Sequence, residues 1–362
     1  MFLNALRRSH FLGFQSRASL LLASLFVSLG LSVLPGQAMA SGEQQEIHAR
    51  QQSGAIVDIA QLDAALNRGA ILWDVRSADE YKRGHLPGAI NFGDAGKVLR
   101  DEQKEDFLPT ATIEKLFSEA GLDPSKEIIV YGARGNAYAY FGGYAVRFFG
   151  GKKVAVFHDG FEGWREAGRP VSTDGTKLAP VALKLETAPA LVLSTAEVLE
   201  RFSRPGVQVV DVRTRKEFSG ADIRAIRGGH IPGAVNIPYE ENWQDPATPQ
   251  KLAKKEVAST EGLALKTRPA LEALYKGLDR EKETIVYCQS GVRASETSAV
   301  LESLGFKNVK VYDSSWLGWA AKLSAPVDNE TFLNVGALKG QISSLKRQLD
   351  ELEKRLTVRQ GA

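Results

Sequence analysis

The chain has 362 residues, of which 43% are hydrophobic, and this length is sufficient for two domains of ordinary size. Its 46 lysine and arginine residues nearly balance 43 acidic residues, so the formal net charge is only +3. No basic stripe with interleaved aromatic residues is present, and we expect no nucleic-acid partner. The sequence also lacks a Cys/His cluster for zinc or iron and a glycine-rich phosphate loop, so we expect no metal site.

Residues 1–40 have the pattern of an export signal. They contain three basic and no acidic residues, an apolar stretch from Ala18 to Leu34, and a small-x-small cleavage sequence, Ala38-Met39-Ala40. The alternative is an uncleaved membrane anchor, but an apolar stretch of about 17 residues is at the low limit for spanning a bilayer. We therefore predict a cleaved signal peptide and a mature protein in a bacterial periplasm.

The sequence then repeats itself once. Residues 71–92 (ILWDVRSADEYKRGHLPGAINF) and 209–237 (VVDVRTRKEFSGADIRAIRGGHIPGAVNI) share Asp-Val-Arg, an acidic–aromatic pair and a Gly-His-x-Pro-Gly-Ala-x-Asn block. Residues 128–135 (IIVYGARG) likewise match 284–291 (TIVYCQSG). A repeat of about 140 residues is too long for a solenoid and indicates two homologous domains in tandem.

Both copies alternate short apolar runs with helical patterns, which is typical of βαβ units and parallel sheets. We predict an α/β fold with two domains, each a parallel sheet with helices on both faces. The predicted boundaries are 54–171 for the first domain, 172–193 for a loop-like linker and 194–333 for the second domain.

The single cysteine, Cys288, follows the apolar run 284–287 and opens a six-residue loop that ends at Arg293, after which the pattern turns helical. Backbone N–H groups and the positive end of the helix dipole favour a thiolate at such a position, and the same cradle can hold an anion. A buried structural cysteine is the alternative. Polar neighbours and the expected export, where an odd thiol is usually reactive or paired between chains, favour a functional residue.

The sequence therefore predicts Cys288 as the catalytic nucleophile. The predicted substrate-binding residues are the rest of its loop: Gln289, Ser290, Gly291, Val292 and Arg293. In the first copy, Gly132 stands at the cysteine position. Glycine has no side chain that could act as a nucleophile, so we expect the first domain to be catalytically inert. We expect it to serve as a scaffold that lines one wall of an interdomain cleft.

Cysteine phosphatases use a similar cradle whose loop is one residue longer, so the shorter loop here better suits a single sulfur atom than a phosphate ester. The loop resembles the active loop of the rhodanese sulfurtransferases, and the matched blocks resemble the signature regions of that family over residues 54–333. This resemblance implies that Cys288 takes the outer sulfur of a donor as a persulfide and passes it to cyanide, a thiol or a protein partner. It implies no metal or organic cofactor.

The resemblance leaves two donors and a second class of function open. Enzymes of the family that use 3-mercaptopyruvate place arginines after the second Asp-x-Arg block, where this chain has Glu217, although Arg224 or Arg227 could reach over. We therefore expect thiosulfate as the donor. The alternative class is a non-enzymatic persulfide carrier or sulfur-binding module that a partner protein loads.

Several shared residues are open to a structural interpretation. His85 and His230 lie in the Gly-His-x-Pro-Gly blocks, and their identical context in an inert domain favours a turn over catalysis. The Asp-x-Arg pairs at 74–76 and 211–213 are interpreted in the same way, although Asp211 could touch the catalytic loop. The charged, proline-containing segment 238–266 either covers that loop or forms a solvated insertion.

Residues 336–359 carry a heptad seam with spacings of 4, 3, 4, 3 and 4, which predicts a helix of coiled-coil character. The seam residues are Leu338, Ile342, Leu345, Leu349, Leu352 and Leu356. We expect this helix to mediate homo-oligomerisation or the docking of a partner. The alternative is a helix that packs back on the body of the protein.

Overall fold

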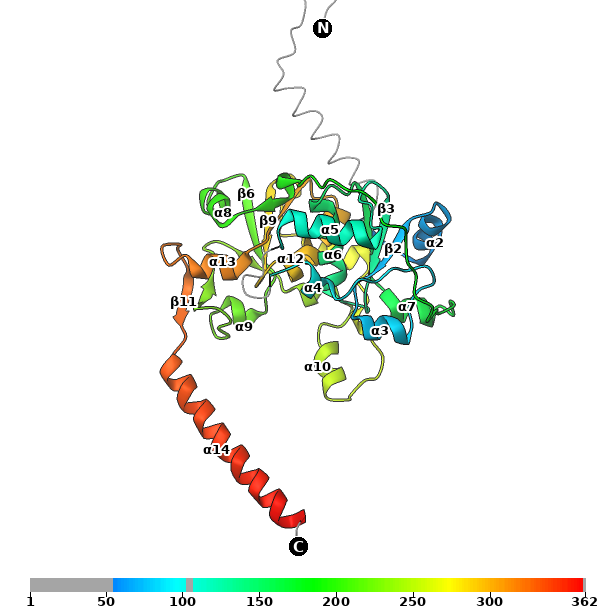
Figure 1. Cartoon of the computed structure of the whole chain (residues 1–362). Coiled ribbons are helices and arrows are strands. Elements are labelled where there is room, and N and C mark those ends of the chain that lie inside the picture. The colour runs from blue at the N-terminus through cyan, green and yellow to red at the C-terminus, as the bar shows by residue number, and fades with distance from the viewer. Residues whose placement is uncertain (1–54, 102–106, 361–362) are drawn as a thin grey trace, which may run out of the picture. The chain divides into compact units, whose positions relative to one another are not determined.

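The computed structural model describes residues 55–101 and 107–360 (Figure 1). The predicted signal peptide at 1–40 lies outside these residues. The described residues belong to one compact unit that contains two parallel sheets. Within these ranges, no helix is both long and apolar enough to cross a membrane.

The first sheet has four parallel strands in the order β1-β4-β3-β2. Its strands are β1 (Ile56–Val57), β2 (Ile71–Asp74), β3 (Glu127–Tyr131) and β4 (Lys153–Phe157). The accompanying helices are α2 (Ile59–Asn67), α3 (Ala78–Arg83), α4 (Ala95–Val98), α5 (Thr110–Ala120), α6 (Ala137–Phe148) and α7 (Gly160–Glu166). Helices α2 and α3 each begin with a capping box, which satisfies backbone N–H groups at the helix start.

Each face of this sheet has its own core, because successive strand residues point to opposite faces. On one face, Trp73 and Val130 pack in a cluster that contains residues of α5 and α6. On the other, Leu72 and Ile129 pack in a cluster that contains residues of α2, α3 and α7. Helices therefore cover both faces, as the alternation in the sequence predicts.

The second domain has a five-stranded parallel sheet in the order β5-β10-β9-β6-β8. Its strands are β5 (Val192–Leu193), β6 (Val207–Asp211), β8 (Val235–Asn236), β9 (Glu283–Tyr287) and β10 (Asn308–Tyr312). Strand β7 (Arg227–His230) instead pairs antiparallel with β11 (Asp328–Phe332).

The helical segments around this sheet are η1 (Pro189–Leu191), α8 (Thr195–Arg201), α9 (Arg215–Phe218), η2 (Tyr239–Asn242), α10 (Thr248–Ala253), η3 (Glu261–Leu263), α11 (Arg268–Leu274), α12 (Val292–Ser303) and α13 (Ser315–Ala321). Segments η1, η2 and η3 are 3₁₀ helices. With both domains observed as parallel sheets and helices, the predicted α/β fold class is confirmed.

The two domains share a central core. One cluster of buried residues contains Val130 and Phe141 of the first domain together with Val286 and Val300 of the second. Helix α6 lies against helix α12 across this boundary. Near its end, Arg147 donates two hydrogen bonds to Glu302, at 2.8 and 2.9 Å. The first domain, which has no cysteine, is thus a packing partner of the helix that follows the cysteine loop.

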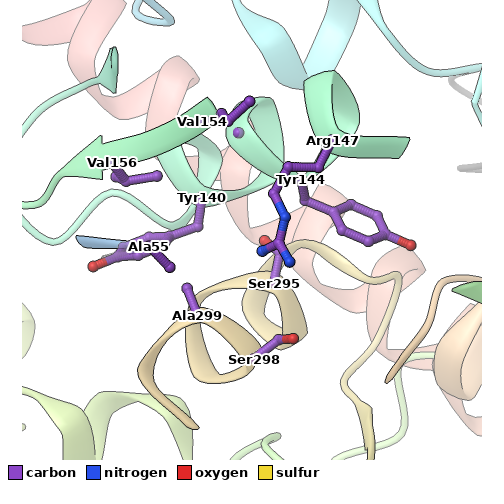
Figure 2. Close-up of a pocket in the computed structure, with 10 residues that line it drawn as sticks. Ala55, Tyr140, Tyr144, Arg147, Val154, Val156, Ser295, Ser298 and Ala299 are labelled. Carbon is purple, nitrogen blue, oxygen red and sulfur yellow. The ribbon is translucent and has the colours of Figure 1, made fainter. Parts of the chain in front are cut away.

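A small cavity lies between these two helices (Figure 2). Tyr140, Tyr144 and Arg147 of α6 line it opposite Ser295 and Ser298 of α12. Its volume of about 20 Å³ is close to what one water molecule needs. It contains no residue of the 288–293 loop and is a packing gap rather than a ligand site.

The chain ends in the long helix α14 (Val335–Gln360), drawn in orange to red in Figure 1. This confirms the predicted C-terminal helix. The seam residues named above are all exposed, from 39% for Leu338 to 63% for Leu345. The helix therefore presents a continuous apolar stripe to solvent.

Candidate active site

The predicted loop begins where β9 ends. Strand β9 lies between β10 and β6 in the sheet, and Cys288, which is 1% exposed, follows its last residue. The loop leads directly into α12, which starts at Val292. Gly291 precedes the helix with φ of +85°, and a Cβ there would lie 2.6 Å from Asp313 Oδ1. Only glycine fits this left-handed, crowded position.

The backbone of the loop is hydrogen-bonded to the residues that follow β10. Cys288 N and Gly291 N both donate to Ser315 Oγ at 3.1 Å. Trp316 N donates to the Cys288 carbonyl at 3.0 Å, and Leu317 N donates to the Gln289 carbonyl at 3.1 Å. The loop is therefore fastened at its first residue, at its second residue and at the helix entry.

The remaining backbone donors of the loop are available to a ligand. Among the described residues, the N–H groups of Gln289, Ser290, Val292 and Arg293 have no acceptor. They come from the residues that follow the sulfur and from the first turn of α12, where the helix dipole is positive. This arrangement can stabilise a thiolate or a terminal persulfide anion.

Arg293 does not act as an isolated positive charge. Its guanidinium donates to both carboxylate oxygens of Glu217, at 2.8 and 2.9 Å. Glu217 belongs to α9, where it also accepts from Thr214 N at 3.0 Å in a capping box. Burial disfavours the charged form of Glu217, but the hydrogen bonds and charge of Arg293 outweigh it and lower the pKa of the carboxyl from 4.5 to about 2.

The Arg293–Glu217 pair also interacts with Cys288 and with Arg224. Burial lowers the pKa of the Arg293 guanidinium, but Glu217 and then the Cys288 thiolate raise it more, and the net shift is upward. Arg224 donates to Glu217 Oε1 at 3.2 Å, and its side chain is 53% exposed. The Glu217 carboxylate is thus shared by two guanidinium groups.

The side chain of Gln289 is hydrogen-bonded to the segment between α9 and β7. Its Nε2 donates to the Arg224 carbonyl at 2.7 Å, and its buried Oε1 has no partner among the described residues. One of the two N–H donors of this amide is thus taken, which fixes the orientation of the side chain beside the loop. Ser290 is half-buried and Val292 is buried.

Both histidines of the repeated blocks have local partners. His85 stacks on Tyr81 at 3.7 Å between ring centroids, and its Nδ1 lies 2.8 Å from the Tyr81 carbonyl. His230 stacks on Phe218 at 3.6 Å, with Nδ1 at 2.9 Å from the Phe218 carbonyl. These contacts agree with the interpretation of the blocks as turns.

The Asp-x-Arg pairs also have equivalent roles in both copies. Arg213 donates to both carboxylate oxygens of Asp211 and to the Gly229 carbonyl at 2.7 Å, which links the end of β6 to β7. Arg76 binds Asp74 and the Gly84 carbonyl in the same way. In the described part of the chain, no hydrogen bond joins Asp211 to the 288–293 loop.

The equivalent loop of the first domain is closed by protein groups. Arg134 N donates to Glu162 Oε2 at 2.7 Å, so a carboxylate already uses this backbone donor. A Cβ at Gly135 would lie 2.9 Å from the Leu263 Cβ of the second domain. This loop of the first domain is thus a contact surface within the protein.

The segment 238–266 connects these features. Near its start, Trp243 Nε1 donates to Glu296 of α12 at 3.0 Å. Near its end, the Leu263 carbonyl lies 2.8 Å from Nε2 of His158 in the first domain. Burial lowers the pKa of His158, which keeps the imidazole neutral, with Nε2 as the donor and Nδ1 as the acceptor from Tyr140. The segment bridges α12 and the inert loop, so it is more than a solvated insertion.

Two contacts of the site were not predicted from the sequence. Ser315 supports the loop from 27 residues away, and Glu217 pairs with Arg293 from 76 residues away. Aligning residues 156–164 (VFHDGFEGW) with 311–319 (VYDSSWLGW) places Ser315 opposite Gly160, and this difference between the copies was the available clue. Within the described residues, no group of three or more His, Cys, Asp or Glu residues could hold a metal ion.

Comparison with known proteins agrees with this geometry. The rhodanese-like domain family matches residues 58–167 and 194–322. The thiosulfate sulfurtransferase of Corynebacterium glutamicum is 32% identical over 72% of this chain and 83% of its own length. A putative thiosulfate sulfurtransferase of Mycobacterium tuberculosis is 33% identical over 68% of this chain and 87% of its own length.

The chain therefore belongs to the rhodanese family, in its tandem-domain form. It is a sulfurtransferase enzyme, which acts on a sulfur donor and a sulfur acceptor. The sulfur carrier protein TtuD of Thermus thermophilus is also similar, with 29% identity over 68% of this chain and 86% of that protein. The solved structure of wild-type EanB shares the fold, with a TM-score of 0.64 at 21% identity over 76% of this chain and 69% of that one.

Proposed function

We propose that the protein transfers a sulfane sulfur from thiosulfate to a thiophilic acceptor through a persulfide on Cys288. The observation that carries this proposal is the loop itself. It joins the only cysteine of the chain to four backbone N–H groups that have no acceptor among the described residues, at the start of a helix. Such donors stabilise the negative charge that a thiolate and a terminal sulfur carry.

The two half-reactions balance without a further reactant. In the first, the Cys288 thiolate attacks the outer sulfur of thiosulfate. The sulfur–sulfur bond of thiosulfate breaks, and sulfite leaves with the bonding electron pair. In the second, cyanide, a thiolate or a protein thiol attacks the terminal sulfur, and Cys288 leaves as a thiolate. This is covalent catalysis with two substrates that bind in turn.

The arginines near the loop support thiosulfate over 3-mercaptopyruvate. Arg227 is 2% exposed and donates to Glu330 and to the carbonyl groups of α13 and the residues after it, so it cannot reach a substrate carboxylate. Glu217 takes up Arg293 and part of Arg224. Arg224 also pairs with Glu217, but its side chain is 53% exposed, so part of its guanidinium can meet a small inorganic anion.

A second candidate is a persulfide carrier that a partner protein loads. One observation favours keeping it: the likeness to the sulfur carrier protein of Thermus thermophilus. Turnover separates the two candidates. A carrier accepts one sulfur from its partner and stops, whereas an enzyme cycles with thiosulfate and cyanide.

The test is mass spectrometry of the protein after incubation with thiosulfate, beside Cys288→Ser, with cyanide added afterwards. We expect the wild type alone to gain about 32 Da, one sulfur atom held as a persulfide, and to release it as thiocyanate over many cycles. No added sulfur from thiosulfate or from 3-mercaptopyruvate would contradict the enzymatic proposal and favour the carrier.

We also propose that the protein is exported to the periplasm and that α14 mediates association. The leader at 1–40 supports the first, and N-terminal sequencing of protein from a periplasmic fraction would test it, with Ser41 expected as the first residue. The exposed heptad seam of α14 supports the second, through a second copy or a partner with a matching helix.

A further inference from the structure

Ser315 occupies an unusual place beneath the cysteine loop. It is fully buried, and it is one of three non-glycine residues with positive φ, at +49°, in the described part of the chain. Its hydroxyl accepts from Cys288 N and Gly291 N, both at 3.1 Å, and donates to the Tyr312 carbonyl at 2.7 Å. Every hydrogen-bonding site of this hydroxyl is therefore in use.

The backbone conformation of Ser315 is unfavourable for any residue with a Cβ. The first copy avoids this with Gly160, whose φ is +56°. Even so, the two turns support their loops in the same way. Phe161 N donates to the Gly132 carbonyl at 2.9 Å, and Trp316 N donates to the Cys288 carbonyl at 3.0 Å. The backbone contact is common to both copies, but the hydroxyl occurs only in the copy that has the cysteine.

The serine also has room that the first copy lacks. A Cβ at Gly160 would lie 2.3 Å from the Gly132 carbonyl oxygen and 3.0 Å from Arg134 N. In the second copy the loop stands far enough from the turn to admit a side chain. The Ser315 hydroxyl fills that space and is shared between the two ends of the Cys288–Gly291 segment.

We propose that Ser315 is a positioning residue for the nucleophile. Its hydroxyl takes up the N–H groups of Cys288 and Gly291 and thereby fixes the curvature of the loop. The N–H groups of Gln289, Ser290 and the start of α12 are then left to surround the sulfur. This inference rests on the proposed role of Cys288, and it adds a residue that acts on the thiolate only through the backbone.

The neighbouring residue Asp313 reinforces the same turn. Its Oδ1 lies against Gly291, and Arg100 of the first domain approaches it with Nη2 at 3.6 Å. Arg100 and Asp313 are both buried. The inert domain thus contributes a charged contact to the turn that carries Ser315, two residues from the hydroxyl.

The experiment compares Ser315→Ala and Ser315→Gly with wild type in the full-length protein. Alanine removes only the hydroxyl, whereas glycine also relieves the backbone strain and reproduces the residue of the first copy. Because Cys288 is the only cysteine, the ultraviolet absorbance of its thiolate can be followed against pH, with Cys288→Ser as the blank. The second readout is kcat/KM for transfer from thiosulfate to cyanide.

We expect both variants to ionise Cys288 at higher pH than wild type and to lose about tenfold in kcat/KM, or about 1.4 kcal/mol of transition-state stabilisation. The matched control is Ser303→Ala. Ser303 also donates a 2.7 Å hydrogen bond to a carbonyl, but at the far end of α12. We expect this control to leave both readouts unchanged.

A folded Ser315→Gly protein with the wild-type ionisation curve and the wild-type kcat/KM would overturn the inference. If Ser315→Ala fails to fold, Ser315→Gly still decides, because it lacks the strained Cβ. Failure of the proposed function would look different: wild type itself would take up no sulfur from thiosulfate, while the thiolate titration would still report on Ser315.

Discussion

The pairing of Arg293 with Glu217 makes a quantitative prediction for Glu217→Gln, which keeps the shape of the side chain and removes its charge. The side chains of the pair are 14% and 2% exposed, so the loss leaves a guanidinium in a mostly dry site. The fall of the Glu217 pKa from 4.5 to about 2 corresponds to about 3 kcal/mol of folding stability at neutral pH. We expect the variant to lose about that amount.

The pH dependence of this difference has a definite sign. The pKa of Glu217 is lower in the folded protein than in the unfolded chain, so its contribution is complete above pH 4.5. As the pH falls, the unfolded chain binds the proton first and the contribution shrinks. At pH 3 about 1.4 kcal/mol should remain, and little should remain near pH 2.

The assay is urea unfolding of both proteins at pH 7 and at pH 3, with the free energy of unfolding as the readout. The matched control is Glu127→Gln. Glu127 accepts the same pair of hydrogen bonds from Arg68, but those side chains are 26% and 58% exposed, so a loss of less than about 1 kcal/mol is expected. A Glu217→Gln protein within about 1 kcal/mol of wild type at pH 7 would refute the reasoning, since buried pairs should cost more to break.

Three further predictions concern the inert copy, the donor and the terminal helix. Gly132→Cys in a Cys288→Ser background should fold, because the new Cβ meets nothing closer than 3.4 Å, but it should gain no sulfur from thiosulfate, because Glu162 already takes the Arg134 N–H. A gain of one sulfur by mass spectrometry would show that the cysteine alone suffices. Steady-state kinetics should give a larger kcat/KM for thiosulfate than for 3-mercaptopyruvate, and the reverse ranking would overturn that choice. A chain truncated before Gly336 should form assemblies with fewer subunits than the full protein does. An unchanged number of subunits by light scattering would count against association through α14.

The features that could be predicted from the sequence are those encoded locally. The cysteine loop was recognisable because an apolar strand, a short polar loop and a helical pattern follow one another within 284–300. The presence of two homologous domains was recognisable because both copies carry the same short turn sequences, such as Gly-His-x-Pro-Gly. The structure confirms the two sheets and the terminal helix. They could be predicted because each depends on hydrophobic periodicity within a short window.

The features that could not be predicted are pairings between distant segments. Arg293 is predicted as a substrate-binding residue of the loop, and no local pattern indicates that the position of α9 beside the loop gives it a carboxylate partner. Gln289 is predicted to bind substrate, and no local pattern indicates that the segment carrying Arg224 supplies a carbonyl for one of its amide hydrogens. Nothing in the local sequence fixes which helix lies beside which loop, because that depends on how two sheets share one core.

The burial of α12 has a consequence for how the repeat can be divided. Nine of its 12 residues are buried. The helix has no single buried face, because the sheet covers it on one side and α6 on another. Cutting the chain at the linker would strip the helix of the second cover and expose the Glu302 carboxylate that Arg147 now holds. The half that contains Cys288 therefore depends on the half without a cysteine for the burial of α12, which gives a physical reason for the first copy to remain in the chain.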